Sequence, residues 1–158
     1  MTLSPAILFV CLGNICRSPL AEGALRAATE AAGLDWLIDS AGTSDWHVGS
    51  PPDSRAIATA LANGVDISGQ RARQIEAADF TRFTHIFALD SKNLADLKQI
   101  APGMASAELA LLLDIVPART GQGVPDPYHS DTDAFAWTWR HVSEAADALV
   151  ARLNSSAS

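Results

Sequence analysis

Hydrophobic residues along this chain form short continuous runs, and stretches with helical spacing lie between the runs. A short apolar run that is bounded by glycine, asparagine or serine is typical of a strand buried on both faces of a sheet. Such runs predict strands over residues 6–11, 36–41, 85–90 and 109–113.

Apolar residues at helical spacing predict four helices between and after these strands. They are expected over residues 18–33, 51–61, 91–100 and about 135–153. Ser18 and Ser91 are the expected N-caps of the first and third helices, because a serine side chain accepts a hydrogen bond from the first turn. One face of the last helix carries Phe135, Trp139, Val142, Ala146, Leu149 and Leu153.

The alternation of strands and helices predicts the α/β class. We expect a single domain over residues 1–153, a doubly wound four-stranded parallel sheet with helices on both faces, followed by a disordered tail over residues 154–158. A chain of 158 residues is long enough for one such domain with its own core. In an open sheet, ligands bind beyond the carboxyl ends of the strands, so the loop after the first strand is a candidate site.

Composition and charge narrow the classes of function. The formal net charge of −7 and the pI of about 4.8 disfavour non-specific binding to nucleic acid or to anionic membranes. The apolar run at residues 6–12 is too short to span a bilayer and no signal-peptide cleavage site follows, so we expect a cytoplasmic protein. The two cysteines, Cys11 and Cys16, are too few for a secreted disulfide framework, which favours catalytic or redox-sensing roles.

Residues 10–19, V-C-L-G-N-I-C-R-S-P, connect the first strand to the first helix. The N–H groups of such a loop and the dipole of the helix favour a bound anion. Gly13 and Asn14 tolerate the left-handed backbone that turns N–H groups inward, and the planar fork of Arg17 matches two phosphate oxygens. The residues expected to bind the anion are Leu12, Gly13, Asn14, Ile15, Cys16, Arg17 and Ser18.

Cys11 lies at the base of this loop. The N–H groups, the helix dipole and Arg17 all favour its thiolate form, which is a strong nucleophile. The alternative is that Cys11 and Cys16 are small hydrophobic residues that pack against the strand and the helix. The Cys-x4-Cys spacing lacks the second ligand pair of a zinc site, and no nucleotide-binding Lys-Ser or Lys-Thr ends the loop, so neither a metal nor a cofactor is expected.

The string C-L-G-N-I-C-R-S-P over residues 11–19 resembles the signature loop of the low-molecular-weight protein tyrosine phosphatases. The stretch D-S-A-G-T-S-D-W-H-V-G-S-P-P-D over residues 39–53 resembles the second segment of that family, and V-P-D-P-Y-H over residues 124–129 resembles its acid loop. Only residues 101–123 lack a recognisable motif. The resemblance implies the phosphotyrosine phosphatase I-like fold.

The resemblance also implies the reaction, which is hydrolysis of phosphotyrosine and small aryl phosphates through a phosphocysteine on Cys11. By similarity, Arg17 and the loop amides bind phosphate, and Asp126 is the general acid and then the general base. The alternative for Asp126 is a polar turn residue between two prolines. Ser18 is expected to stabilise the thiolate, in addition to or instead of capping the helix. The implied partners are phosphotyrosine-containing proteins and phosphate or another oxyanion, and we expect a monomer.

Two positions are expected to support Asn14 in the resemblance. One is Ser40, and the other lies within residues 68–73. Here the chain departs from the family pattern, because Gln70 stands where many relatives carry a histidine. Glutamine can donate and accept hydrogen bonds but cannot become charged, so its role differs from that of a histidine.

Five further residues match positions with family roles. Trp46, Tyr128 and His129 resemble the rim that grips a substrate ring, with His129 in place of a frequent tyrosine. The alternative for these side chains is packing in the core. Cys16 is expected to trap oxidised Cys11 as a reversible disulfide, or to pack beneath the loop. Asp90 matches a family aspartate, although helix capping would explain it as well.

Two rival functions stay open at this point. An arsenate reductase on the same scaffold passes its oxidation to further cysteines, whereas this chain has two cysteines in all. A catalytically inactive oxyanion-binding or redox-sensing module would need only Cys11 and Cys16. Asp126 distinguishes the phosphatase from the inactive module, because a module that only binds or senses needs no proton donor for a leaving group. The phosphatase is therefore the favoured interpretation.

Overall fold

The computed structural model describes residues 4–157 and contains one sheet of four parallel strands. The strands are β1 (Ala6–Cys11), β2 (Leu37–Gly42), β3 (His85–Ala88) and β4 (Glu108–Leu111), and their order across the sheet is β2-β1-β3-β4. In β1, Ile7 pairs with Ile38 of β2 and with His85 of β3. The predicted four-stranded parallel α/β fold is confirmed.

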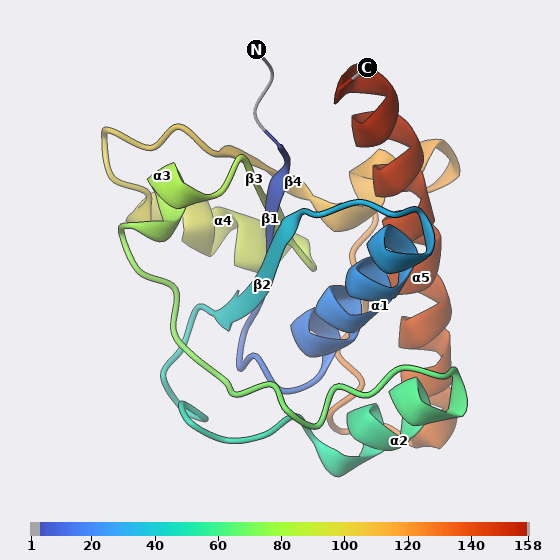
Figure 1. Ribbon diagram of the computed structural model, residues 1–158. Helices are drawn as coiled ribbons and strands as arrows, with labels where there is room; N and C mark the ends of the chain where they lie inside the picture. Colours follow the sequence, from blue (N-terminus) through green and yellow to red (C-terminus); the bar gives the residue numbers. More distant parts are fainter. Residues whose placement is uncertain (1–3, 158) are drawn as a thin grey trace.

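Helices cover both faces of the sheet (Figure 1). One face packs on α1 (Arg17–Ala31), α2 (Ser54–Ala62) and α5 (Thr132–Ala157), and the other packs on α3 (Asp79–Arg82) and α4 (Ser91–Ile100). The alternation of side chains along β1 divides it between these layers: Phe9 and Cys11 join the first core, and Leu8 and Val10 join the second. The central strand is therefore buried on both faces, as its uninterrupted apolar run predicts.

Two predicted helix caps are wrong. The N-cap of α1 is Cys16, so Ser18 lies inside the first turn and its hydroxyl is used elsewhere. The N-cap of α4 is Asp90, whose carboxylate accepts a hydrogen bond from the N–H of Asn93, and Ser91 is the first helical residue. Ser18 contacts Cys11, and Asp90 binds Arg17 as well as capping α4; local capping preference reveals neither tertiary contact.

Other boundaries differ from the predicted ones by a few residues. The N-cap of α2 is Asp53, and the single-turn α3 was not predicted. Residues 112 and 113 belong to the 3₁₀ helix η1 (Leu112–Ile115) instead of β4, and a second 3₁₀ helix, η2 (Pro117–Arg119), follows. The last helix continues through residues 154–157, where a tail was expected, and Ser158 lies outside the described residues.

The strand order creates a switch point between β1 and β3, because their following helices, α1 and α4, cover opposite faces. The crevice at such a point is the preferred ligand position of an open α/β sheet. Cys11 ends β1 and Asp90 follows β3, so both border this crevice.

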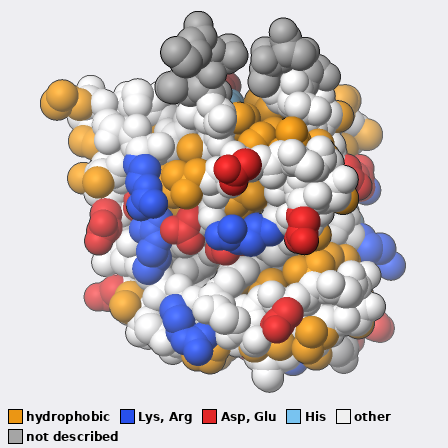
Figure 2. All heavy atoms as spheres, in the orientation of Figure 1, with side chains coloured by type: hydrophobic (Ala, Val, Ile, Leu, Met, Phe, Trp, Pro, Cys, Tyr) orange, Lys and Arg blue, Asp and Glu red, His pale blue; other side chains and the backbone are white. Residues whose placement is uncertain are grey.

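On the molecular face seen in Figure 2, Lys and Arg side chains lie beside Asp and Glu side chains. No helix within residues 4–157 is long and apolar enough to cross a membrane.

Candidate active site

The loop of residues 11–18, hereafter the oxyanion loop, is held in shape by Asn14. Asn14 is 3% exposed and has a left-handed backbone with φ of 57°. Its amide nitrogen donates to the hydroxyls of Ser18 and Ser40, both at 2.9 Å, and its carbonyl oxygen accepts from the backbone N–H of Arg73 at 3.0 Å. The expected support from Ser40 and from residues 68–73 is present, and it comes from Arg73.

The hydrogen bonds of the described residues do not join Gln70 to Asn14. The side-chain nitrogen of Gln70 donates to the carbonyl of Pro19 at 3.1 Å, and its buried Oε1 has no hydrogen-bond partner among residues 4–157. The side chain of Asn14 is therefore supported by Ser18, Ser40 and the backbone N–H of Arg73.

The end of β2 lies directly against the oxyanion loop. A Cβ atom on Gly42 would lie 2.7 Å from the carbonyl oxygen of Leu12, closer than two such atoms approach in folded proteins. The N–H groups of Thr43 and Ser44 donate to the carbonyls of Cys11 and Leu12 at 2.9 and 3.0 Å. These bonds satisfy the carbonyls of Cys11 and Leu12 and fix the start of the oxyanion loop against the end of β2.

Ser18 contacts the sulfur of Cys11, with an Oγ to Sγ distance of 3.0 Å. The hydroxyl accepts a bond from Asn14 and has one proton of its own to donate. That proton is therefore available to Sγ. The local sequence resembles a helix cap, but the hydroxyl serves the cysteine.

A buried acid extends the same network away from the cysteine. Ser40 donates to Oε1 of Glu22 at 2.7 Å, and Arg26 donates to Oε2 at 2.9 Å. Burial raises the pKa of Glu22, while the bonds from Ser40 and Arg26 oppose the shift. Sequence reasoning missed this residue, although a carboxylate four positions after Ser18 on the apolar side of a helix is a detectable signal.

Arg17 is almost fully buried, with a side chain 4% exposed. Nη1 donates to Asp90 Oδ2 at 2.7 Å and to the carbonyl of Val124 at 2.9 Å, while Nη2 lies 3.9 Å from Asp126 Oδ2. Burial by itself lowers the pKa of Arg17, but the surrounding anionic groups, of which Cys11 contributes most, raise it above its ordinary value. Asp90 thus holds Arg17 with one oxygen and caps α4 with the other.

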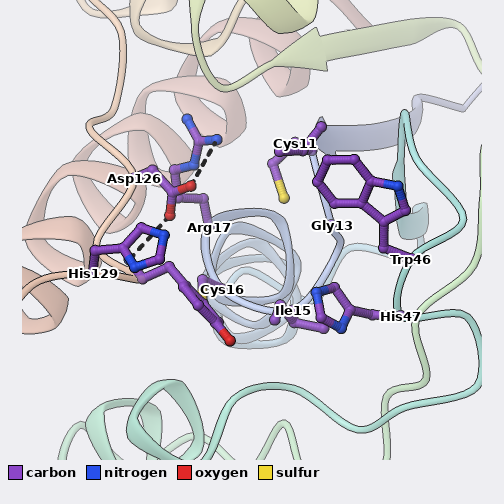
Figure 3. Close-up of a pocket in the computed structure, with 11 residues that line it drawn as sticks. Cys11, Gly13, Ile15, Cys16, Arg17, Trp46, His47, Asp126 and His129 are labelled. Carbon is purple, nitrogen blue, oxygen red and sulfur yellow. Dashed lines mark hydrogen bonds and ion pairs between the residues drawn. The ribbon is translucent and has the colours of Figure 1, made fainter.

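A cavity of about 180 Å³ opens above the oxyanion loop. Its lining comprises Cys11, Leu12, Gly13, Ile15, Cys16, Arg17, Trp46, His47, Asp126, Tyr128 and His129. Figure 3 shows the sulfur of Cys11 directed into the space between Trp46 and Asp126. The structure therefore brings together the expected nucleophile, arginine, acid and aromatic rim.

The rim side chains are exposed, as a binding surface requires. Trp46 is 71% exposed and Tyr128 is 39% exposed, and the rings of Tyr128 and His129 meet edge to face at 4.9 Å. None of the three is in the core, which removes the packing alternative. His47 also lines the cavity and was missed, because a histidine within a loop carries no periodic signal.

Cys16 lines the cavity from below and is buried, and both cysteines are free thiols. Burial raises the pKa of Cys16 well above that of an ordinary thiol, with smaller contributions in the same direction from Asp53, Cys11 and Asp126. Within the described residues, no group of three or more His, Cys, Asp or Glu side chains could hold a metal ion.

Comparisons with known proteins agree with this geometry. The family model described as low molecular weight phosphotyrosine protein phosphatase matches residues 6–158. A protein of that description from Schizosaccharomyces pombe is 41% identical over 138 residues, covering 85% of this chain and 88% of its own.

Solved structures also align over nearly the whole chain. A protein tyrosine phosphatase from Entamoeba histolytica superposes with a TM-score of 0.91 at 30% identity, over 98% of this chain and 100% of its own. A Drosophila arginine phosphatase, DARP, superposes with a TM-score of 0.88 at 30% identity, over 93% of this chain and 96% of its own.

Proposed function

The chain belongs to the low molecular weight phosphotyrosine protein phosphatase family, and on this premise we propose that it hydrolyses phosphotyrosine in proteins, and small aryl phosphates, through a phosphocysteine on Cys11. One observation carries the proposal. The sulfur of Cys11 lines a cavity that is also lined by a buried arginine, a carboxylate and an aromatic rim. Each of these groups has a task in phosphate ester hydrolysis.

In the first step, the Cys11 thiolate attacks phosphorus, so that an S–P bond forms and the P–O bond to the phenol breaks. Asp126, as the neutral acid, gives its proton to the departing phenolate oxygen and becomes a carboxylate. Arg17, which Asp90 and the carbonyl of Val124 hold through Nη1, and the N–H groups of the oxyanion loop bind the phosphoryl oxygens and stabilise the charge of the transition state.

In the second step, water attacks the phosphorus of the phosphocysteine. Asp126 takes a proton from this water, an O–P bond forms, and the S–P bond breaks to release phosphate and the Cys11 thiolate. The Ser18 hydroxyl, 3.0 Å from Sγ, donates to the departing sulfur and lowers the cost of its negative charge. Asp126 is protonated again and ready for the next substrate.

The aromatic rim favours an aryl substrate over the phosphoguanidine that an arginine phosphatase cleaves. Exposed rings at the mouth of the cavity offer a flat phenol two stacking partners, Trp46 and Tyr128. We therefore propose higher kcat/KM for a phosphotyrosine peptide than for the matched phosphoarginine peptide.

The remaining parts of the proposal concern the setting of the reaction. We propose a monomeric, cytoplasmic enzyme that acts without metal or cofactor and does not engage nucleic acid or membranes, consistent with its charge of −7. Cys16 is proposed to capture oxidised Cys11 as a disulfide, which protects Cys11 from irreversible oxidation. The Cys16→Ser variant is then expected to recover its phosphatase activity more slowly than wild type after peroxide treatment.

The test is hydrolysis of aryl phosphates in EDTA by the wild type, Cys11→Ser and Asp126→Ala. Cys11→Ser is expected to abolish turnover, and Asp126→Ala to lower kcat/KM by about 10²-fold or more for poor leaving groups and much less for good ones. Rapid denaturation of the wild type during turnover, without acid, is expected to leave phosphate on Cys11. A wild-type protein that binds phosphate without turning over any ester would overturn the proposal and favour the binding module.

A further inference from the structure

The side chain of Arg55 lies between the start of α2 and the acid loop, residues 124–129. On the α2 side it binds Asp53, with Nε 3.0 Å from Oδ1 and Nη2 3.0 Å from Oδ2. Asp53 is the N-cap of α2 and also accepts from the backbone N–H of Arg55 at 2.8 Å. This is a bidentate arginine–carboxylate pair, which fixes the plane of the guanidinium.

The opposite side of the guanidinium binds carbonyls far along the chain. Nη2 donates to the carbonyl of Tyr128 at 2.9 Å, and Nη1 donates to the carbonyl of Ser130 at 3.1 Å. The N–H of Tyr128 in turn donates to Oδ1 of Asp126 at 3.1 Å. Arg55 therefore holds the same residue whose N–H orients the proposed general acid.

Two further contacts fix the position of this arginine. Its guanidinium carbon lies 4.6 Å from the ring centroid of Phe135, a fully buried residue of α5, and 5.6 Å from that of Tyr128. Cation–π contact of this kind favours a guanidinium stacked on the ring over one that is free in solvent. The hydrogen bond to Asp53 raises the pKa of Arg55, so the side chain stays charged.

Asp53 connects this assembly to the oxyanion loop. Its backbone N–H donates to the carbonyl of Ile15 at 2.8 Å. A continuous series of contacts thus runs from the loop that holds the nucleophile, through Asp53 and Arg55, to the loop that holds Asp126. The carboxylate of Asp53 is sufficient to cap α2. The hydrogen bonds from Arg55 to the carbonyls of Tyr128 and Ser130 are therefore not needed for capping.

We propose that Arg55 is a positioning residue that sets the distance of the Asp126 carboxyl from the Cys11 nucleophile by tying the acid loop to the start of α2. The inference rests on the proposed function, because it assigns a task within that reaction. Asp126 itself is 46% exposed and lies on a segment between η2 and α5 that has no helix or strand, so its position depends on such tertiary contacts. A displacement of about 1 Å at a reacting group lowers rates by up to about 10²-fold.

The test compares Arg55→Ala and Arg55→Lys with wild type on phosphate esters whose phenols differ in acidity. Arg55→Ala is expected to lower kcat/KM about 10-fold for phenyl phosphate and less than about 3-fold for dinitrophenyl phosphate, because only the poorer leaving group needs the proton. Arg55→Lys retains the charge but cannot bridge Asp53 and both carbonyls, so a partial form of the same selectivity is expected. If Arg55→Ala does not fold, Arg55→Lys carries the test.

Arg82→Ala is the matched control. Arg82 also lies over a buried phenylalanine ring, Phe83, at 5.5 Å, but it belongs to α3 on the opposite face of the sheet. We expect its kcat/KM to equal that of wild type for every ester. Thermal unfolding of all variants separates loss of fold from loss of positioning.

A double variant, Arg55→Ala with Asp126→Ala, decides between positioning and a general structural effect. If Arg55 acts through Asp126, the double variant is expected to lose no more activity than Asp126→Ala alone. A loss that adds in full to that of Asp126→Ala, or an equal fall of Arg55→Ala on all esters, overturns the inference. Failure of Asp126→Ala to change the leaving-group dependence is a different result, and it would overturn the proposed role of Asp126 itself.

Discussion

Replacement of Asn14 by alanine is expected to be among the most damaging changes to the oxyanion loop, because it removes three contacts and introduces backbone strain. The side chain binds Ser18, Ser40 and the N–H of Arg73 at 2.9 to 3.0 Å, and all three partners are at least partly buried. Alanine can replace none of these bonds. It also has to adopt φ of 57°, which asparagine tolerates better.

The expected loss follows from these contacts. Three hydrogen bonds at about 1 kcal/mol each give about 3 kcal/mol, and the left-handed backbone adds about 1 kcal/mol for alanine. Asn14→Ala should therefore lower the free energy of unfolding by about 4 kcal/mol and Tm by about 10 °C. Asn14→Gly loses the same bonds without the strain, so its loss should be smaller by about 1 kcal/mol.

Urea unfolding followed by tryptophan fluorescence measures these differences. Asn63→Ala is the control, because Asn63 makes one side-chain bond, to the carbonyl of Thr59 at 2.9 Å, and has negative φ. We expect the control to lose about 1 kcal/mol or less. A loss below about 1 kcal/mol for Asn14→Ala, or a larger loss for glycine than for alanine, would refute the reasoning.

Two further predictions concern Cys16 and Glu22. Because burial raises the pKa of the Cys16 thiol, iodoacetamide at mildly alkaline pH is expected to modify Cys11 well before Cys16, as read by peptide mass spectrometry; equal rates would contradict it. Burial raises the pKa of Glu22 in the folded chain above the ordinary value of 4.5. Glu22 therefore stabilises the fold most at pH values below 4.5, and this stabilisation is lost as the pH rises through the pKa of the folded chain. Glu22→Gln should remove this decline in urea unfolding, whereas Glu30→Gln, at an exposed position of α1, should keep it; equal pH dependence in both variants would exclude the assignment.

The sequence predicts the fold well where burial alone decides the structure. The apolar run of β1 needs no partner-specific information, and both its bounds and its position in the centre of the sheet follow from burial on two faces. The single turn of α3 is too short to carry a period, and the last two residues expected in β4 form a 3₁₀ turn. These short elements depend on tertiary packing that no local pattern encodes.

In the candidate active site too, local sequence predicts some residues, and others depend on tertiary contacts. The residues of the oxyanion loop are contiguous and carry a motif, so the sequence identifies them together. The resemblance implies the contact of Ser18 with Cys11, whereas the capping role predicted from local pattern is wrong, because Ser18 contacts a residue seven positions away on another element. Glu22 and Arg55 were missed for a related reason, since a charged residue on a helix is ordinarily solvated and only the folded chain brings its partners within reach.

One backbone group fixes the orientation of the Asn14 amide, which lies between Glu22 and Cys11 in the hydrogen-bond network. The N–H of Arg73 can only donate, so it fixes the carbonyl oxygen of Asn14 and turns the amide nitrogen toward both serine hydroxyls. Each hydroxyl then accepts from Asn14 and keeps one proton to donate, which Ser40 gives to Oε1 of Glu22 and Ser18 can give to a Cys11 thiolate. In the charged form of Glu22 both carboxylate oxygens accept, Oε1 from Ser40 and Oε2 from Arg26, so the carboxylate keeps the Ser40 hydroxyl in this orientation. The buried acid thus adds a pH dependence to stability through the same network that holds Asn14.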